Sequence, residues 1–466
     1  MTDAKGLGGI IAQDGFDYQV WDALARLPFW LRNPAFEGLG VEMLEDFEAR
    51  FFAPHAVGKH VLDRFQAKSG MLSRADMVGV FESFAAFDAA HPGVTRIQTL
   101  VTPALPAQMA WVARDPSRVR RARPFYSPFT DVCAASDGKL RQDLINEFGA
   151  DLGGFLAERV EVDLHLVQDR AGAEATFAAA LHKAFPDLDV GARKTSAAFA
   201  ALNDLISQSR GSMIPRDRLL PLLDRELGTA LVSDRRLQIH VRSDRNSADQ
   251  SAIEIDCSAF SGTNGQFPPA SNWQAELVAP LETTANWARR HNHHRIALSG
   301  SYRLTTAMAI GWSFRSATGF EIDIGTKTGA WATDDFPGTN ALKESWQIEF
   351  PKRLTSDRLV VSLGILRDPR LDVLNHLGLS SQDELLTAML PTSIGTGVEA
   401  QIAVQALKMA VVYAVGQFNP KAIDLFIAGP AALAVALGHR WNALPATQLY
   451  EFVAGERRYV PTITLS

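Results

Sequence analysis

The sequence predicts an α/β protein of at least two domains, and three observations lead to this expectation. The chain has 466 residues, and a domain takes roughly 150. Helical spacings alternate with short strand-like runs along most of the chain. A polar, weakly patterned stretch at residues 243–250 is the best candidate for a linker. We therefore predict domains at residues 1–240 and 241–466.

The first domain is expected to begin with a helix at residues 14–26, where apolar side chains recur at spacings of three and four. Residues 38–52 read as extended, and within them we expect a strand at 41–47. A further strand is predicted at 60–68. The later elements are a helix at 74–90 that ends at a His-Pro-Gly break, strands at 95–101 and 161–168, and helical patterns from 173 to 228.

The second domain shows the order strand, glycine-containing loop, helix twice. The first copy is a strand at 294–298, Ser299-Gly300-Ser301 and a helix at 303–310. The second copy is a strand at 422–428, Gly429-Pro430 and a helix at 431–437. Strands at 320–324 and 358–363 and a helix at 397–416 complete the pattern. We interpret this half as two related α/β units that face one another.

Composition limits the classes of function. Hydrophobic residues make up 47% and charged residues 21%, which is ordinary for a globular protein. Two cysteines, Cys133 and Cys257, exclude a disulfide framework and any multi-cysteine metal site. We find no apolar stretch of membrane-spanning length and no signal-peptide pattern, so we expect a cytoplasmic protein. The net charge of -6 means that contact with DNA would depend on local basic patches.

Polar residues of neighbouring predicted strands converge at one sheet edge. Gln66 and Lys68 alternate onto the same strand face, and Asp46 lies on the adjacent strand. This arrangement can hold Mg²⁺ or Mn²⁺ and polarise a water against a phosphodiester. Asp46 and Gln66 would be the metal ligands, with the Ala67 carbonyl as a further candidate, and Lys68 would orient the water or neutralise developing charge. Glu45 is the competing acid.

The pattern Q-x-G-F-x-Y-Q … E-D-F … F-Q-A-K-S resembles the restriction-endonuclease-like PD-(D/E)xK superfamily. More narrowly, it resembles the N-terminal nuclease domain of bacterial anti-phage effectors that cut double-stranded DNA. The resemblance implies catalytic roles for Asp46, Gln66 and Lys68 and for a helix glutamine, either Gln19 or Gln13. Gln66 stands where Asp or Glu is usual, which removes one negative charge and leaves the number of metal ions open.

A basic segment follows the predicted strand at 95–101. Its arginines are Arg114, Arg118, Arg120, Arg121 and Arg123, and Phe125 and Tyr126 come next. The functional interpretation is a clamp on the phosphate backbone of DNA, with Arg118, Arg120, Arg121 and Arg123 as contacts. The alternative is a solvated surface loop. Because no base-reading signature accompanies the arginines, we expect weakly sequence-specific binding.

Residues 240–466 resemble the SAVED domain, a ligand sensor built from two fused CARF-like, Rossmann-like halves. The segments that carry the resemblance are L-S-G at 298–300, A-I-G-W at 309–312, Trp331, A-G-P at 428–430 and L-Y-E at 449–451. The resemblance implies binding of a cyclic oligonucleotide, a tri- or tetranucleotide made by a partner nucleotidyltransferase, in a bacterial anti-phage (CBASS) system.

Loops beyond the carboxyl ends of strands hold ligands in such folds, and helix N-termini present N–H groups to phosphates. The predicted ligand-binding residues are Ser299, Gly300, Tyr302, Arg303, Trp331, Arg367, Gly429 and Pro430. Trp331 would stack on a base, with core packing as the alternative. Arg303 or Arg367 would meet phosphate.

One motif is set aside. Residues 395–400 match the dinucleotide fingerprint G-x-G-x-x-A, but the preceding residues 385–393 do not read as a convincing strand, so we expect no nicotinamide or flavin site.

The resulting expectation is an antiviral effector. A cyclic oligonucleotide would bind the C-terminal sensor and activate a metal-dependent, weakly sequence-specific endonuclease for double-stranded DNA. The resemblance implies activation through self-association. Two alternatives remain open: a non-catalytic signalling protein that binds ligand and DNA, and an enzyme that acts on the cyclic nucleotide itself.

Overall fold

The chain forms two compact units, residues 1–233 and 234–466, in a computed structural model. The predicted boundary at 240/241 would cut strand β7 (Leu237–Arg242), which pairs with β8 and β9, so the division lies earlier in the chain. The predicted linker falls mostly outside the described residues. The structure describes residues 4–126, 130–165, 167, 169–232, 236–243, 252–262, 265–327, 329–335, 346–354 and 356–466. Within these ranges the side chains of residues 4–13, 120–126, 130 and 131 are not described.

The first unit is built on a six-stranded mixed sheet with the order β5-β4-β3-β2-β1-β6. Strands β3, β4 and β5 are parallel, so their carboxyl ends meet at one edge, and the turn that follows β1 lies at the same edge. The strands are β1 (Phe36–Val41), β2 (Phe47–Phe52), β3 (His60–Ala67), β4 (Thr95–Thr102), β5 (Val160–Leu164) and β6 (Ser212–Pro215).

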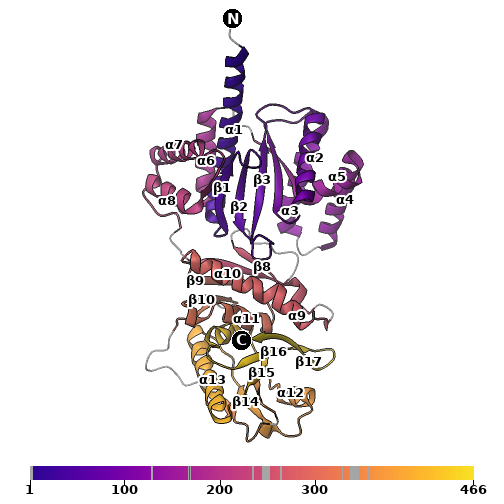
Figure 1. The fold of residues 1–466 in the computed structure, drawn as a ribbon, viewed down its shortest axis with the longest axis vertical. Helices are drawn as coiled ribbons and strands as arrows, with labels where there is room; N and C mark the ends of the chain where they lie inside the picture. Colours follow the sequence, from indigo (N-terminus) through magenta and orange to yellow (C-terminus); the bar gives the residue numbers. More distant parts are fainter. Residues whose placement is uncertain are drawn as a thin grey trace. The chain divides into compact units, whose positions relative to one another are not determined.

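Helices cover both faces of this sheet (Figure 1). One layer holds α1 (Ala4–Arg32), α6 (Arg170–Ala184), α7 (Ala192–Gln208) and α8 (Arg216–Leu227). The other holds α2 (Arg74–Ala90), α3 (Ala110–Tyr126), α4 (Thr130–Phe148) and α5 (Ala150–Arg159), with a 3₁₀ turn at Ala107–Met109. Phe47 and Phe65 stack at 4.6 Å between ring centroids on the α1 side. The basic segment at residues 114–126 lies in helix α3, so it is helical and not a loop.

The predicted strand at 41–47 is wrong. Residues 42–46 form a tight turn between β1 and β2, closed by a hydrogen bond of 2.9 Å from Glu42 N to Asp46 O. Glu42 takes a left-handed backbone conformation with φ 53°, which turns the chain and ends β1. All five residues of this turn are exposed or half-buried, so its acidic residues do not mark one face of a strand.

The second unit contains two sheets whose central strands run parallel, as the repeated strand–loop–helix order predicted. The first sheet has the order β11-β10-β9-β7-β8 and the second β12-β14-β13-β15-β16-β17. The strands of the first are β7, β8 (Ile253–Asp256), β9 (Arg295–Gly300), β10 (Glu321–Thr326) and β11 (Gly329–Ala332). Those of the second are β12 (Gln347–Glu349), β13 (Arg358–Ile365), β14 (Leu385–Leu390), β15 (Ala422–Ala428), β16 (Ala446–Val453) and β17 (Arg458–Leu465).

Two small-residue helices join the halves of this unit. Helix α11 (Leu304–Ser313) follows β9 and α14 (Ala431–Arg440) follows β15, so they are equivalent elements of the two halves. A Cβ at Gly311 would lie 2.0 Å from Val435 O, and one at Gly438 would lie 2.2 Å from Met308 O. The two backbones touch because glycine has no side chain. The remaining helices are α9 (Ala270–Asn272), a π-helical turn (Trp273–Val278), α10 (Ala279–Arg290), α12 (Arg370–Leu377), α13 (Gly397–Phe418) and short 3₁₀ turns at Ser258–Phe260, Ser316–Thr318 and Gln382–Glu384.

Helix α13 alone among the described helices is long and apolar enough to cross a membrane. One side of it is buried within the second unit, where Val404, Leu407 and Val411 are at most 2% exposed. Such a packed helix of a folded domain meets the same criteria of length and composition.

Candidate functional site

The candidate metal centre lies where β3 ends. The β2–β3 register pairs Phe47 with Phe65, so Asp46 stands opposite Gln66 one step further along. Asp46 Oδ2 accepts a hydrogen bond of 2.6 Å from Ala67 N, which ties the turn to the end of β3. The backbone N–H of Lys68 still donates to Val101 O on β4, so strand geometry extends to Lys68, two residues beyond Gln66. The structure therefore brings Asp46, Gln66 and Lys68 to one edge.

Glu45, the competing acid, has a structural partner. Its Oε1 accepts a hydrogen bond of 2.7 Å from Arg64 Nη2, and the Arg64 side chain is only 1% exposed. Arg64 also donates to Gln98 Oε1 at 2.9 Å and lies 3.4 Å above the ring of Phe87. Removing one partner of such a buried pair costs roughly 3–5 kcal/mol. Glu45 thus anchors the turn, which leaves Asp46 as the stronger metal-ligand candidate of these two acids.

Burial sets the electrostatics of this edge. Desolvation raises the pKa of the Asp46 carboxyl above its ordinary value, and the Ala67 N–H and Lys68 oppose this rise. Burial likewise raises the pKa of Glu45 and of Glu48, whose side chains share this part of the sheet. Carboxylates that are costly to ionise in the protein alone favour a cation beside them.

Two buried glutamine oxygens indicate whether the residues of this edge are suited to a metal ion. The Oε1 atoms of Gln66 and Gln19 are buried and have no hydrogen-bond partner among the described residues. An unsatisfied buried acceptor costs about 1–3 kcal/mol, which a cation or its waters would offset. These amide oxygens and the Asp46 carboxylate are donors of the kind that Mg²⁺ and Mn²⁺ prefer. In the described part of the chain no three His, Cys, Asp or Glu side chains group for a metal, so the amides would be needed.

A network that sequence reasoning missed holds helix α1 in place. Asp22 on α1 is 1% exposed, and its Oδ1 lies 2.5 Å from His165 Nδ1 just after β5. Arg26 binds Asp22 at 2.8 Å and Asp163 at 2.6 Å. These contacts join α1 to the carboxyl end of β5 and so set the position of Gln19. The D-x-x-x-R spacing of the helix was the one signal available in the sequence.

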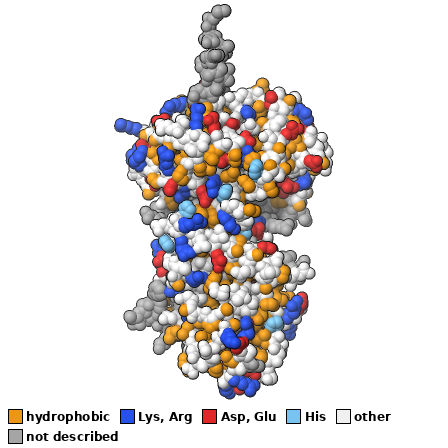
Figure 2. All heavy atoms as spheres, viewed as in Figure 1, with side chains coloured by type: hydrophobic (Ala, Val, Ile, Leu, Met, Phe, Trp, Pro, Cys, Tyr) orange, Lys and Arg blue, Asp and Glu red, His pale blue; other side chains and the backbone are white. Residues whose placement is uncertain are grey.

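The arginine cluster on α3 lies partly outside the described residues. The Arg118 side chain is 67% exposed and lies 3.8 Å from Asp115, which also binds Arg114 at 2.8 Å. The side chains of Arg120, Arg121 and Arg123, and that of Gln13, lie outside the described residues. Charges of both signs are interspersed over the visible face of the first unit (Figure 2), so any attraction of DNA would be local.

In the first half of the second unit, the predicted ligand loop follows β9. Ser299 Oγ lies 3.0 Å from His240 Nδ1, and Arg303 Nε donates to Ser261 O at 2.7 Å. Burial raises the pKa of the Tyr302 hydroxyl. Gly300 has φ 108°, and a Cβ there would lie 2.0 Å from Val241 O. Gly300 is therefore required by packing against β7, independently of any ligand.

The N-terminus of α11, behind this loop, is met by a carboxylate of the chain itself. Glu451 on β16 is 4% exposed, and its Oε1 accepts a hydrogen bond of 2.8 Å from Thr305 N. Burial raises the pKa of Glu451 despite this bond. The Thr305 amide is thus already used, and a phosphate would have to rely on the loop before it.

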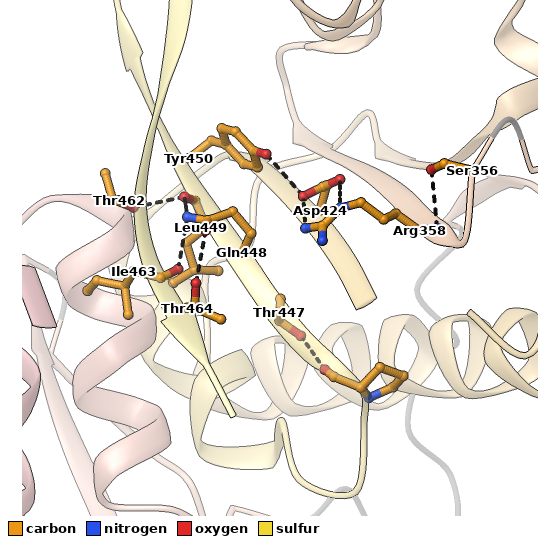
Figure 3. A network of polar contacts seen from close by, with 11 residues as sticks. Ser356, Arg358, Asp424, Thr447, Gln448, Leu449, Tyr450, Thr462, Ile463 and Thr464 are labelled. Atoms are coloured by element: carbon orange, nitrogen blue, oxygen red, sulfur yellow. Dashed lines mark hydrogen bonds and ion pairs between the residues drawn. The ribbon is translucent and has the colours of Figure 1, made fainter. Parts of the chain in front are cut away.

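Glu451 belongs to the L-Y-E segment, and Tyr450 of that segment is also structural. Figure 3 shows Arg358 and Tyr450 directed at Asp424 from neighbouring strands. Arg358 Nε donates to Asp424 Oδ2 at 2.7 Å and Tyr450 OH to Oδ1 at 3.0 Å. The network ties β13, β15 and β16 together, which explains these residues without a ligand.

The second half contributes a matching loop. Gly429 and Pro430 lie between β15 and α14, and Pro430 is the N-cap of α14. Arg367 follows β13, with a side chain 61% exposed that binds Asp372 at 2.9 Å and covers the Phe452 ring at 4.9 Å. These residues remain accessible to a ligand.

Trp331 is the exception among the predicted ligand contacts. It lies on β11 and is 6% exposed, so its ring is packed in the core and is not available to stack on a base. The packing alternative is the one that the structure supports, because β11 runs beside the start of α13 at Gly397.

The reason given for excluding a dinucleotide site was also wrong. Residues 385–390 do form a parallel strand, β14, and a loop leads from it to α13. The amides of the fingerprint are nevertheless engaged, because Glu399 Oε2 accepts from Gly395 N at 2.7 Å and from Thr396 N at 3.2 Å. This capping box fills the place of a pyrophosphate with a carboxylate of the chain.

Comparison with known proteins agrees with this organisation. Residues 281–465 match the family model described as "SMODS-associated and fused to various effectors sensor domain", SAVED. Two curated relatives named "CD-NTase-associated protein 4" align with the whole chain and 99% of their own lengths. One is from Moraxella osloensis, at 24% identity, and the other from an Acinetobacter species, at 23%.

Solved structures show the same fold over both units. The Acinetobacter baumannii Cap4 SAVED/CARF-domain containing receptor with the cyclic trinucleotide 2'3'3'-cAAA superposes with a TM-score of 0.75 at 20% identity, covering 97% of this chain and 98% of that one. The Moraxella osloensis Cap4 receptor gives 0.72 at 20% identity, covering 97% and 99%. The match to the SAVED model is thus confined to the second unit, and the chain is similar to the Cap4 proteins over its full length.

Proposed function

We propose that this chain, a Cap4 homologue with a C-terminal SAVED domain, is an anti-phage effector that degrades double-stranded DNA when a cyclic oligonucleotide binds its second unit. The observation that carries the nuclease part is the placement of Asp46, Gln66 and Lys68 at the end of β3. The SAVED match and the cyclic trinucleotide named for the related receptor support the sensor part.

At the first site, Asp46 and Gln66 would hold Mg²⁺ or Mn²⁺, with Gln19 as a further oxygen donor from α1. A bound divalent cation would supply charge stabilisation and a more acidic water at neutral pH. Asp46 is fixed for this role by its bond to Ala67 N, and Lys68 would orient the attacking water and offset charge that develops on the phosphate. The exposed Arg118 on α3 would contact the backbone of the duplex.

At the second site, the loops before α11 and α14 would hold the ligand between the two halves. Ser299, Tyr302 and Arg303 come from the first half and Arg367 and the Gly429-Pro430 loop from the second. The Thr305 N–H already donates to Glu451, so it is not free for a phosphate. The guanidinium groups of Arg303 and Arg367 would bind the phosphates instead. Self-association of ligand-bound chains would bring two nuclease sites to one duplex.

The first experiment tests both sites. We would incubate the full chain with linear duplex DNA and Mg²⁺, with and without cyclic di-, tri- and tetranucleotides. We expect fragmentation with one ligand, and a loss of at least 100-fold in cleavage rate for Lys68→Ala with unchanged ligand binding by calorimetry. Lys183→Ala, at the C-terminus of α6, is the matched control, because it is an exposed lysine that should leave cleavage intact.

Ligand binding without fragmentation, together with no heat of Mg²⁺ binding, would favour the non-catalytic alternative. Gln66, in place of a carboxylate, is the residue that keeps this alternative open.

A further inference from the structure

Exposed apolar side chains gather at the edge that carries the candidate metal centre. In the described part of the first unit, large apolar side chains are exposed at Phe29, Met43, Leu44, Val57, Met71, Val132 and Leu164. Met43 and Leu44 lie in the turn after β1, Met71 follows β3, and Leu164 ends β5. Single exposed apolar residues are ordinary, but a group around a candidate catalytic carboxylate calls for a physical account.

Two of these exposed residues are close in sequence to the proposed catalytic residues Asp46 and Lys68. Leu44 is 57% exposed and two residues from Asp46, so their Cα atoms are at most about 7 Å apart. Met71 is 73% exposed and three residues beyond Lys68, within about 11 Å. These spans correspond to roughly two to three base steps of a DNA strand.

The turn that presents Leu44 is held firmly. The bonds of Glu45 to Arg64 and of Asp46 to Ala67 N anchor it to β3. Met43 folds back over β1, since a Cβ at Gly40 would lie 2.8 Å from Met43 Sδ. Leu44 is therefore the exposed apolar tip of a turn that two hydrogen bonds tie to β3.

The charge of the turn excludes one kind of DNA contact. Residues 42–46 include Glu42, Glu45 and Asp46 and no lysine or arginine, so the turn cannot attract phosphates by its own charge. The side chains of the turn that could contact bases are therefore the exposed apolar ones, Met43 and Leu44. Proteins that distort DNA insert side chains of this kind, leucine and methionine among them, between base steps.

We propose that Leu44, assisted by Met71, inserts against unstacked bases of the duplex beside the phosphate that is cut. This inference rests on the proposed nuclease function and adds a role in substrate distortion. The cost of unstacking depends on the step, so cleavage should favour flexible pyrimidine–purine steps although no side chain reads their edges.

The test uses the full chain with the activating cyclic oligonucleotide. Leu44→Ser should cut a regular duplex at least 10-fold more slowly, and should cut a duplex with a mismatch at the cleaved step within about 3-fold of the wild-type rate. In the Lys68→Ala background, which we expect to bind DNA without cutting it, the fluorescence of 2-aminopurine at that step should increase on binding, and Leu44→Ser should abolish the increase.

Val57→Ser is the matched control, because Val57 is 97% exposed in the hairpin between β2 and β3 at the opposite edge of the sheet. It should change neither cleavage nor fluorescence. Equal Mg²⁺ binding and melting temperature would show that Leu44→Ser leaves the site folded.

Three results would overturn the inference. Wild-type cleavage of both duplexes by Leu44→Ser would show that the apolar tip has no role. An equal loss on both duplexes would assign Leu44 to the structure of the site. A loss of ligand-induced self-association by sedimentation, with base unstacking unchanged, would make the tip a contact between copies of the chain. An inactive wild-type protein, by contrast, would remove the proposed function itself.

Discussion

At the scale of single residues, the Asp46 carboxylate is the most constrained group of the candidate centre. It is half-buried, receives the Ala67 N–H at 2.6 Å and lies near the acids Glu42 and Glu45. Burial raises its pKa, so the folded protein without metal binds a proton at Asp46 more tightly than the unfolded chain does. The ionised form therefore weakens the fold as the pH rises through this raised pKa.

We predict that Asp46→Asn stabilises the metal-free protein at neutral pH. Asparagine carries no charge at any pH and can still accept the Ala67 N–H. In EDTA at pH 7.5 we expect the melting temperature of the first unit to rise by about 2 °C. The difference should shrink as the pH falls through the raised pKa of Asp46, because the wild-type carboxyl then also becomes protonated.

Addition of Mg²⁺ should stabilise the wild-type protein and leave Asp46→Asn unchanged. Differential scanning calorimetry at several pH values measures both effects. A variant that is less stable than wild type at pH 7.5 would contradict the electrostatic account of this residue.

At the scale of elements, the contact between α11 and α14 depends on two glycines. A Cβ added at either would lie within 2.2 Å of a carbonyl oxygen of the facing helix: Gly311 against Val435 O and Gly438 against Met308 O. Alanine is intrinsically a better helix former than glycine by about 1 kcal/mol. Here the close approach should outweigh that preference, because backbone atoms cannot move aside as a flexible side chain can.

We predict that Gly438→Ala destabilises the second unit by about 2–3 kcal/mol in urea unfolding, as expected for overpacking in a close-packed interface. Gly416→Ala is the matched control on α13, because a Cβ there meets nothing within 4 Å. It should be neutral or stabilise by about 0.5–1 kcal/mol. Equal effects of the two substitutions would show that the helices can separate without cost.

At the scale of the whole molecule, the two units have separate cores. Two apolar clusters belong to the first unit, and a cluster that includes Phe426 and Tyr459 belongs to the second. All residues proposed for the ligand lie in the second unit, and all those proposed for cleavage lie in the first. Each unit should therefore bind its own partner when separated from the other.

We predict that a fragment of residues 234–466 binds the activating cyclic oligonucleotide with the affinity of the full chain. At a ligand concentration of 100 Kd, binding should add about 2.7 kcal/mol to its unfolding free energy. The fragment of residues 1–233 should show no shift with ligand. A folded C-terminal fragment without affinity for the ligand would mean that the pocket needs residues of the first unit.

Much of the fold could be predicted from local patterns. The helix at 74–90 and the strand–loop–helix segments around Ser299 and Gly429 appear where periodicity placed them, because their apolar spacing reflects burial on one face. The same patterns placed Gln66 and Lys68 on one strand face. The turn at 42–46 was missed, since its apolar residues Met43 and Leu44 carry the hydrophobic pattern on from β1 to β2 although both are exposed.

The sequence by itself determined the order of the elements and the residue types that can perform the chemistry, because both follow from spacing along the chain. Only the tertiary structure decided which of those residues have other partners. Arg64 forms an ion pair with Glu45, burial makes the Trp331 ring inaccessible to a ligand, and Glu451 accepts the hydrogen bond of the Thr305 N–H. Each of these outcomes depends on contacts between residues far apart in the chain, which no local pattern records.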